Sequence, residues 1–118
     1  KMTTQELTIK DITALIPELF AVMATSYQQM FRVTPDDEIK TQMLKEFKES
    51  LRFETGKVYI KLIAGYSVCG FIVISQTDKQ FKFGDLLKAK SWQAPERNFR
   101  RGNIFQLSKG GVNWHGIG

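Results

Sequence analysis

Residues 57–75 read KVYIKLIAGYSVCGFIVIS, and the expected fold is built outward from this stretch. Apolar and polar side chains alternate over 57–63, which is the period of a strand with one buried face. The apolar side chains on that face are Val58, Ile60 and Leu62. Residues 65–67 predict a turn, and the nearly continuous apolar run 68–75 predicts a central strand covered on both faces.

A third strand follows in the pattern. Residues 76–79 have the composition of a turn, and the segments 80–83 and 85–88 predict a strand that is broken or bulged at Gly84. Consecutive strands joined by short turns pair antiparallel, so the three strands predict a β-meander.

The N-terminal part has the spacing of a helix. Thr8 fits an N-cap, and Asp11 completes its capping box. Apolar residues then recur at helical spacing as the pattern runs on to about Met30: Ile12, Leu15, Ile16, Leu19, Phe20, Met23 and Tyr27. Pro17 lacks a backbone donor, so we expect a break or a kink there.

A second helix is expected to start at Thr34 as N-cap, with Pro35 in the first helical position and carboxylates at 36–38. Its apolar stripe predicts an amphipathic helix that packs one face and ends by Gly56: Ile39, Met43, Leu44, Phe47 and Leu51. Two helices on one face of the meander make an α+β fold. Residues 1–33 either pack on the meander or extend to another molecule.

Length and composition restrict the function. The 118 residues suit one α+β domain, 1–118. The only cysteine, Cys69, and the only histidine, His115, exclude an internal disulfide and a zinc site of the Cys/His type. Cys69 lies in an apolar strand, where we expect an inert thiol. We find no recognisable catalytic constellation, so we expect no enzyme, no cofactor and no metal. Without a long apolar run or a signal-like start, we expect no membrane partner.

Charge is distributed unevenly along the chain. Residues 1–56 carry 7 basic and 9 acidic side chains, a net −2, whereas residues 79–118 carry 8 and 2, a net +6. Such a split favours a basic part that faces a polyanion or an acidic partner, although the same charges also serve simply to keep a surface solvated.

The basic part interleaves cations with aromatic rings. Between 88 and 109 only Glu96 opposes six basic residues, namely Lys88, Lys90, Arg97, Arg100, Arg101 and Lys109. The rings are Trp92, Phe99, Phe105 and, further on, Trp114. Pro95 excludes a central strand or a helix interior, and residues 101–103 predict a turn. We therefore expect an irregular C-terminal segment.

This composition suits single-stranded nucleic acid, because cations neutralise phosphates while rings stack on bases. The candidate residues for binding nucleic acid or an acidic partner are Lys88, Lys90, Trp92, Arg97, Phe99, Arg100 and Arg101. Alternatively, Trp92 and Phe99 fold back on the sheet as core. Three guanidinium groups within 97–101 repel one another unless an anion is near, which favours a ligand role for the arginines.

Four stretches of the second half carry a further signal: KVYIKLI at 57–63, SVCGFIV at 67–73, GDLLKAKSWQAP at 84–95 and RGNIF at 101–105. Together they resemble a group of small tailed-bacteriophage proteins that have no assigned activity. The resemblance implies a phage origin and a setting in the host cytoplasm, with the virion as the alternative, and implies no mechanism. The chain departs from the pattern with Glu96-Arg97 in place of Ala-Lys, and with an insertion at 80–83.

Three functions follow as hypotheses. The first is a bacteriophage accessory protein that binds nucleic acid through its basic aromatic segment. The second is a protein-interaction module that inhibits or redirects a host or defence protein, with Tyr66, Trp92 and Arg100 as contact residues. The third is a small virion or assembly component. The oligomeric state stays open.

Overall fold

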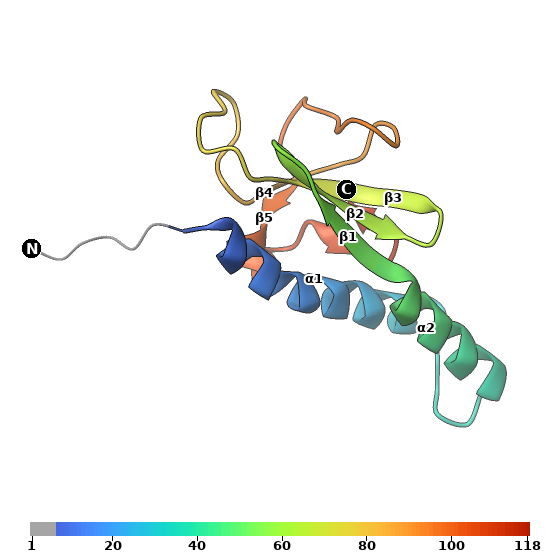
Figure 1. The fold of residues 1–118 in the computed structure, drawn as a ribbon. Helices are drawn as coiled ribbons and strands as arrows, with labels where there is room; N and C mark the ends of the chain where they lie inside the picture. Colours follow the sequence, from blue (N-terminus) through green and yellow to red (C-terminus); the bar gives the residue numbers. More distant parts are fainter. Residues whose placement is uncertain (1–6) are drawn as a thin grey trace, which may run out of the picture.

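The structure, a computed structural model, describes residues 7–118 and shows helices packed on an antiparallel sheet (Figure 1). This confirms the expected α+β class. The main elements are α1 (Ile9–Met30), α2 (Glu38–Ser50), β1 (Leu51–Thr55), β2 (Tyr59–Ala64), β3 (Ser67–Val73), β4 (Asp85–Leu87) and β5 (Gly102–Asn103). The question about residues 1–33 is answered for 7–33, where α1 packs on the sheet; residues 1–6 lie outside the described part.

Helix α1 is one uninterrupted helix, so the expected break at Pro17 is wrong. Its capping box is present, and the Asp11 carboxylate accepts hydrogen bonds from the backbone N–H of Thr8 at 2.6 Å and from its hydroxyl at 3.2 Å. One face of the helix is completely buried on both sides of the proline: Ile12, Ile16, Leu19 and Met23. Proline removes one backbone donor, and continuous burial of this face offsets that loss.

Helix α2 begins and ends elsewhere than the sequence predicts. Its N-cap is Asp37, whose carboxylate accepts from the backbone N–H of Lys40 at 2.9 Å. Thr34 lies outside the helix, because its carbonyl accepts from the Asp37 N–H and closes a turn. The helix ends at Ser50, and Leu51 opens a strand. The predicted stripe is covered only in part: Ile39 is 76% exposed and Met43 is exposed as well. Leu44, Phe47 and Leu51 are half-buried, and the last two pack against the core.

The sheet has five strands in the order β1-β2-β3-β4-β5, each antiparallel to its neighbours in sequence. The three expected strands are therefore the centre of a larger meander. Strand β4 covers only 85–87, and residues 80–83 belong to a loop. Residues 102–103 form the short strand β5 where we expected a turn, because Gly102 has no positive φ and pairs with Leu86.

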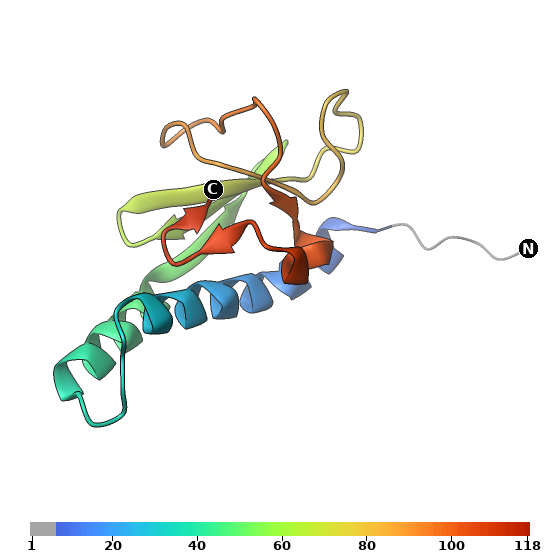
Figure 2. The same ribbon diagram turned by 180° about the vertical axis from the view of Figure 1, so that it is seen from behind.

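The C-terminal segment is irregular only as far as residue 101. After β5 come the 3-10 helix η1 (Ile104–Lys109) and a hairpin of β6 (Val112–Asn113) and β7 (Gly116–Ile117). Figure 2 shows η1 and this hairpin beside α1. The backbone N–H of Trp114 donates to the Ser26 hydroxyl at 3.0 Å. The hairpin packs closely on β3: a Cβ on Gly70 would lie 2.7 Å from Ile117 Cδ1, so only glycine fits there.

The two faces of the sheet have separate apolar clusters. Helix α1 covers one face, with Leu62, Ile72 and Leu86 buried beneath it. On the other face lies a smaller cluster: Phe71, Val73, Phe81 and Leu87. Two irregular loops, 74–84 and 88–101, cover this second face (Figure 1). Within residues 7–118 we find no helix of the length and apolarity needed to cross a membrane.

Candidate nucleic-acid interface

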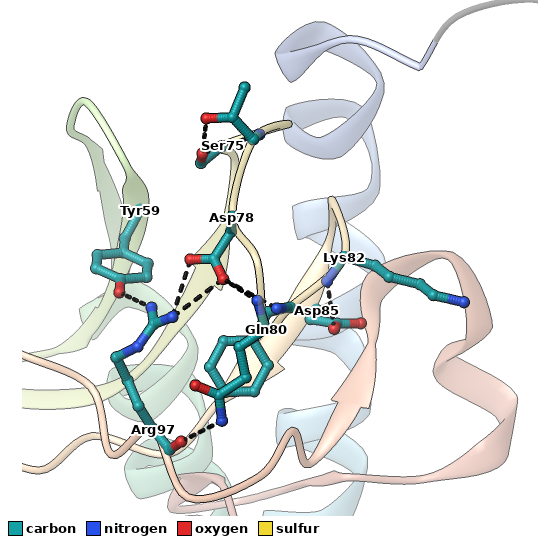
Figure 3. Close-up of polar contacts among 9 residues, drawn as sticks. Tyr59, Ser75, Asp78, Gln80, Lys82, Asp85 and Arg97 are labelled. Carbon is teal, nitrogen blue, oxygen red and sulfur yellow. Dashed lines mark hydrogen bonds and ion pairs between the residues drawn. The ribbon is translucent and has the colours of Figure 1, made fainter.

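Arg97 joins the two loops over the second face (Figure 3). Its Nη2 donates to both carboxylate oxygens of Asp78, at 3.0 Å each, and its Nη1 donates to the Tyr59 hydroxyl. The guanidinium also lies over the Phe81 ring, 4.7 Å from the centroid. Gln80 completes the connection by donating from its Nε2 to the Arg97 carbonyl at 2.7 Å. We call these five residues the loop latch.

Asp78 is the anionic centre of the loop latch. The backbone N–H groups of Phe81 and Gln80 donate to its Oδ1 at 2.9 Å. These two bonds, followed by the contact with Arg97, hold the pKa of Asp78 below its ordinary value. Hydrogen bonds to the charged form stabilise it, so the carboxylate stays ionised at neutral pH. Asp78 thus satisfies Arg97 from inside the molecule.

Asp85 plays a similar part for Arg100. It is the one buried acidic residue in the described chain, 1% exposed. Its Oδ1 accepts from Arg100 Nη1 at 3.1 Å and from Asn103 Nδ2 at 3.0 Å, while Oδ2 accepts from the Lys82 N–H at 2.8 Å (the last bond is drawn in Figure 3). Half of the Arg100 side chain stays exposed.

Arg101 is the most enclosed of the three arginines, with 18% of its side chain exposed. Its Nη2 donates to Glu96 Oε1 at 2.6 Å, and its guanidinium lies 4.1 Å from the centroid of the Phe99 ring. Each arginine of the segment therefore has its own carboxylate. The expected mutual repulsion is relieved within the chain, so the arginine cluster by itself no longer calls for an external anion.

Trp92 lies at the tip of loop 88–101. Ala89 and Pro95 form a single bridge at the base of the tip, and the N–H groups of Lys90 and Ser91 donate to the Ala94 carbonyl. The indole in this closed turn is 43% exposed and lies against Lys61 of strand β2, whose Nζ is 5.1 Å from the ring centroid.

Phe99 is 57% exposed, so neither it nor Trp92 is core. Their suggested role as core is wrong. Phe105 and Trp114 behave differently: both are half-buried, and Trp114 packs edge-on to Phe31 with ring centroids 5.0 Å apart. The four rings thus divide into an exposed pair in the loop and a half-buried pair near α1.

The remaining positive charge belongs to lysines. None of the four ion pairs among residues 7–118 includes a lysine. Five lysines of the C-terminal part stay outside these pairs: Lys79, Lys82, Lys88, Lys90 and Lys109. Lys88 and Lys90 both precede Trp92, at the start of its turn, and are exposed.

A small basic pocket lies among residues 100–110. It has a volume of about 250 Å³, and Arg100, Arg101, Lys109 and Gln106 are among its lining residues. None of its lining residues is acidic. Because Arg101 also lies over Phe99, the pocket and the exposed ring are adjacent. The arrangement suits an anion next to an aromatic or planar group.

Sequence reasoning identified the arginines and missed their partners. Asp78 and Asp85 lie 19 and 15 residues from Arg97 and Arg100, so no local pattern connects them. Lys61 was taken only as part of a strand, and it lies over Trp92. Asp85 within the GDLLKAKSWQAP stretch was the one available signal, because an acidic residue inside an apolar strand needs buried partners.

The other reactive side chains show no assembled site. Cys69 is buried as expected, and desolvation raises the pKa of its thiol to about 11. Its thiolate is therefore scarce at neutral pH. Across residues 7–118, no three His, Cys, Asp or Glu side chains are grouped to hold a metal ion.

Comparison of the chain with protein-family models, with curated proteins and with solved structures finds no match.

Proposed function

We propose that this chain is a bacteriophage accessory protein that binds single-stranded nucleic acid through residues 88–109. The observation that carries the proposal is the pair of exposed rings, Trp92 and Phe99, in a segment whose lysines take part in none of the four ion pairs, with Lys61 also lying over Trp92. Bases stack on exposed rings without regard to sequence, and cations next to the rings hold the backbone phosphates. The phage setting rests on the resemblance of the strands and of the GDLLKAKSWQAP stretch.

The geometry changes the roles that we assign. Lys88, Lys90 and Lys109, together with the exposed half of Arg100, would contact phosphates. Trp92 and Phe99 would stack on bases. Arg97 is committed to the loop latch and would act by holding loop 88–101 in place. Replacing the arginines would therefore disturb folding and binding together, which makes the lysines the better test.

The loop latch contains positions at which this chain departs from the bacteriophage pattern. The two departures from the bacteriophage pattern touch each other, because Arg97 lies over the ring of Phe81 in the inserted stretch. Glu96, the other residue of the first departure, accepts a hydrogen bond from Arg101. We expect this internal pairing to be particular to this chain within the phage group, with the rings and lysines serving the binding role.

The test is a fluorescence anisotropy titration with labelled single-stranded and duplex DNA and RNA at two salt concentrations. The variant is Lys88/Lys90/Lys109→Gln, and the matched control is Lys10/Lys45/Lys48→Gln, three exposed helical lysines elsewhere. We expect log Kobs for single strands to fall by about 0.7 per phosphate contact for each tenfold rise in salt. The variant removes three cations, so its log Kobs should fall less steeply with salt, by about 2 less for each tenfold rise. The control should show the wild-type salt dependence.

Stacking is tested separately. Trp92→Leu and Phe99→Leu keep the charge and should each weaken binding by about 1–3 kcal/mol while leaving the salt slope unchanged. An affinity that does not change between low and moderate salt would rule out the proposal. Binding that is lost equally in the control variant would show attraction by net charge alone.

A second function is favoured by one observation. Tyr66 at the β2–β3 turn is 99% exposed, and Trp92 and Arg100 are also open to solvent. These are the residue types that dominate protein interfaces, so docking to an acidic host or defence protein is our alternative proposal. A stoichiometric host partner retained after nuclease treatment, and released by Tyr66→Ala, would favour it over nucleic acid.

A further inference from the structure

Strand β1 forms one edge of the five-stranded sheet. On its inner side, Gly56 N–H donates to the Tyr59 carbonyl and Gly65 N–H donates to the Ser50 carbonyl, which marks the hydrogen-bonded positions of the β1–β2 ladder. These positions alternate along an antiparallel pair. Residues 52 and 54 therefore direct their backbone groups toward β2, and residues 51, 53 and 55 direct theirs outward.

The outer edge of β1 is open within the described chain. No strand among residues 7–118 pairs with it, and its last four residues are all exposed. Phe53 is 39% exposed although it points to the α1 side of the sheet, opposite Leu62. An open edge with an exposed aromatic ring is a template for pairing with another strand.

We propose that this edge pairs antiparallel with β1 of a second copy of the chain, about a two-fold axis at Phe53. Phe53 then faces Phe53 of the second copy, and the two residues exchange both backbone hydrogen bonds. The Thr55 N–H of each copy donates to the Leu51 carbonyl of the other. The Leu51 N–H is already bonded to the Lys48 carbonyl within α2, so the pairing uses four backbone bonds.

Charge complementarity identifies a second copy as the occupant. The two-fold axis places Arg52 opposite Glu54 of the second copy, and Glu54 opposite its Arg52. These are non-hydrogen-bonded positions, where facing side chains come closest. Arg52 and Glu54 already pair within one chain at 3.0 Å, with about half of each side chain exposed. The dimer would join two such pairs into a square of alternating charge.

The same charges select one register. A shift by two residues would place Arg52 opposite Arg52, or Glu54 opposite Glu54, and like charges that face each other destabilise a strand pair. A shift by one residue would bring inward-directed backbone groups to the outer edge. Five residues a side make a small interface, so the dimer forms reversibly and depends on protein concentration.

The test is sedimentation velocity of the full chain over a concentration series. Wild type should show a monomer–dimer equilibrium. Arg52→Glu and Glu54→Arg each create two facing like-charge pairs and should raise the dimer dissociation constant by at least about tenfold. The double variant Arg52→Glu/Glu54→Arg restores opposite charges and should return to within about threefold of wild type. Lys45→Glu, on an exposed position of α2, is the charge control.

One further variant tests the backbone without changing charge. Thr55→Pro removes an outward N–H and no bond to β2, so it should abolish the dimer while the β1–β2 amides keep their exchange protection. A monomer at every concentration would overturn the proposal. A dimer that Arg52→Glu leaves intact, or that the double variant fails to restore, would overturn it as well.

Discussion

The two faces of the sheet are covered in different ways. On one face, α1 lays four fully buried aliphatic side chains against the strands, and no ion pair is involved. On the other, two loops without regular structure are held by the loop latch over a smaller cluster that includes Phe71 and Phe81. A helix satisfies its own backbone and needs only an apolar face to dock, whereas a loop needs specific polar partners to stay in place.

This difference matters for function because the two exposed rings of the candidate interface belong to a loop that covers the second face. Trp92 and Phe99 can stay exposed there because the loop is fixed by other residues, Arg97 and Pro95 among them. The helix side has the larger buried cluster, and the loop side presents the rings. The predictions below separate these two contributions, from the largest expected effect to the smallest.

Leu19→Ala should have the largest effect. Leu19 is completely buried at the centre of the α1 contact, and loss of such a side chain costs about 2–5 kcal/mol through lost burial and a residual cavity. Urea unfolding followed by circular dichroism measures it as a lower midpoint with an unchanged slope. A loss below about 1 kcal/mol would mean that α1 is not the main stabilising cover.

Asp85→Ala should come next, at about 2 kcal/mol, because it leaves the Lys82 N–H and the Asn103 amide without their buried acceptor. Unlike Leu19→Ala, it should destabilise the structure locally, at the β4–β5 junction. Amide exchange measures this as faster exchange at Arg101 and Ile104, whose N–H groups donate to the Leu86 and Gly84 carbonyls, than at β2. Uniform acceleration across the sheet would contradict a local role for Asp85.

Asp78→Asn should cost about 1 kcal/mol, and the loss should fall on the loop side alone. The amides of Gln80 and Phe81, which donate to Asp78, should exchange faster, while α1 amides keep their rates. The folded-state pKa of Asp78 is depressed, so its stabilisation is present at neutral pH and is lost as pH falls below the ordinary value of 3.8 through the folded-state pKa.

The pH dependence supplies the control for this variant. Wild type should lose loop protection on acidification, and Asp78→Asn should show the weaker protection at every pH. If wild type and variant lost protection in parallel as pH fell, the acid sensitivity would belong to another group.

Ile39→Ser should have the smallest effect, within about 0.5 kcal/mol, because its side chain is 76% exposed. It belongs to the same kind of apolar helical stripe as Leu19, so the pair of variants compares an unburied stripe with a buried one. Thermal unfolding of both proteins in one buffer measures the difference. A large loss of stability in Ile39→Ser would mean that Ile39 contacts another molecule, because the single chain leaves its side chain exposed.

Several elements were predictable because their signals are local. The capping box at Thr8, the period of α1 and the alternation in β2 each lie within a few residues. Strand β1 was missed because Leu51 falls four residues after Phe47 and extends the helical stripe by one position. Strand β5 has two residues and no periodicity, and only pairing with β4 makes it a strand.

The candidate site was predictable in part. Its basic and aromatic residues could be identified from the sequence. Whether each of them is paired, buried or exposed could not. Arg97 and Phe99 are two residues apart, yet one is held by Asp78 and the other is exposed. Which rings are core also depends on contacts from far along the chain, as for Trp114, whose N–H donates to a hydroxyl 88 residues away.

By itself, the sequence determined the α+β class, the cap and apolar face of α1, the central strands and the position of the basic aromatic segment. Their physical basis is hydrophobic periodicity, capping and turn chemistry, which act between near neighbours in the chain. Only the tertiary structure decided that Asp78, Asp85 and Glu96 pair with the three arginines, that Trp92 and Phe99 stay exposed, and that β1 is an open edge. Each of these depends on which residues meet across the fold, and a one-dimensional pattern does not carry that information.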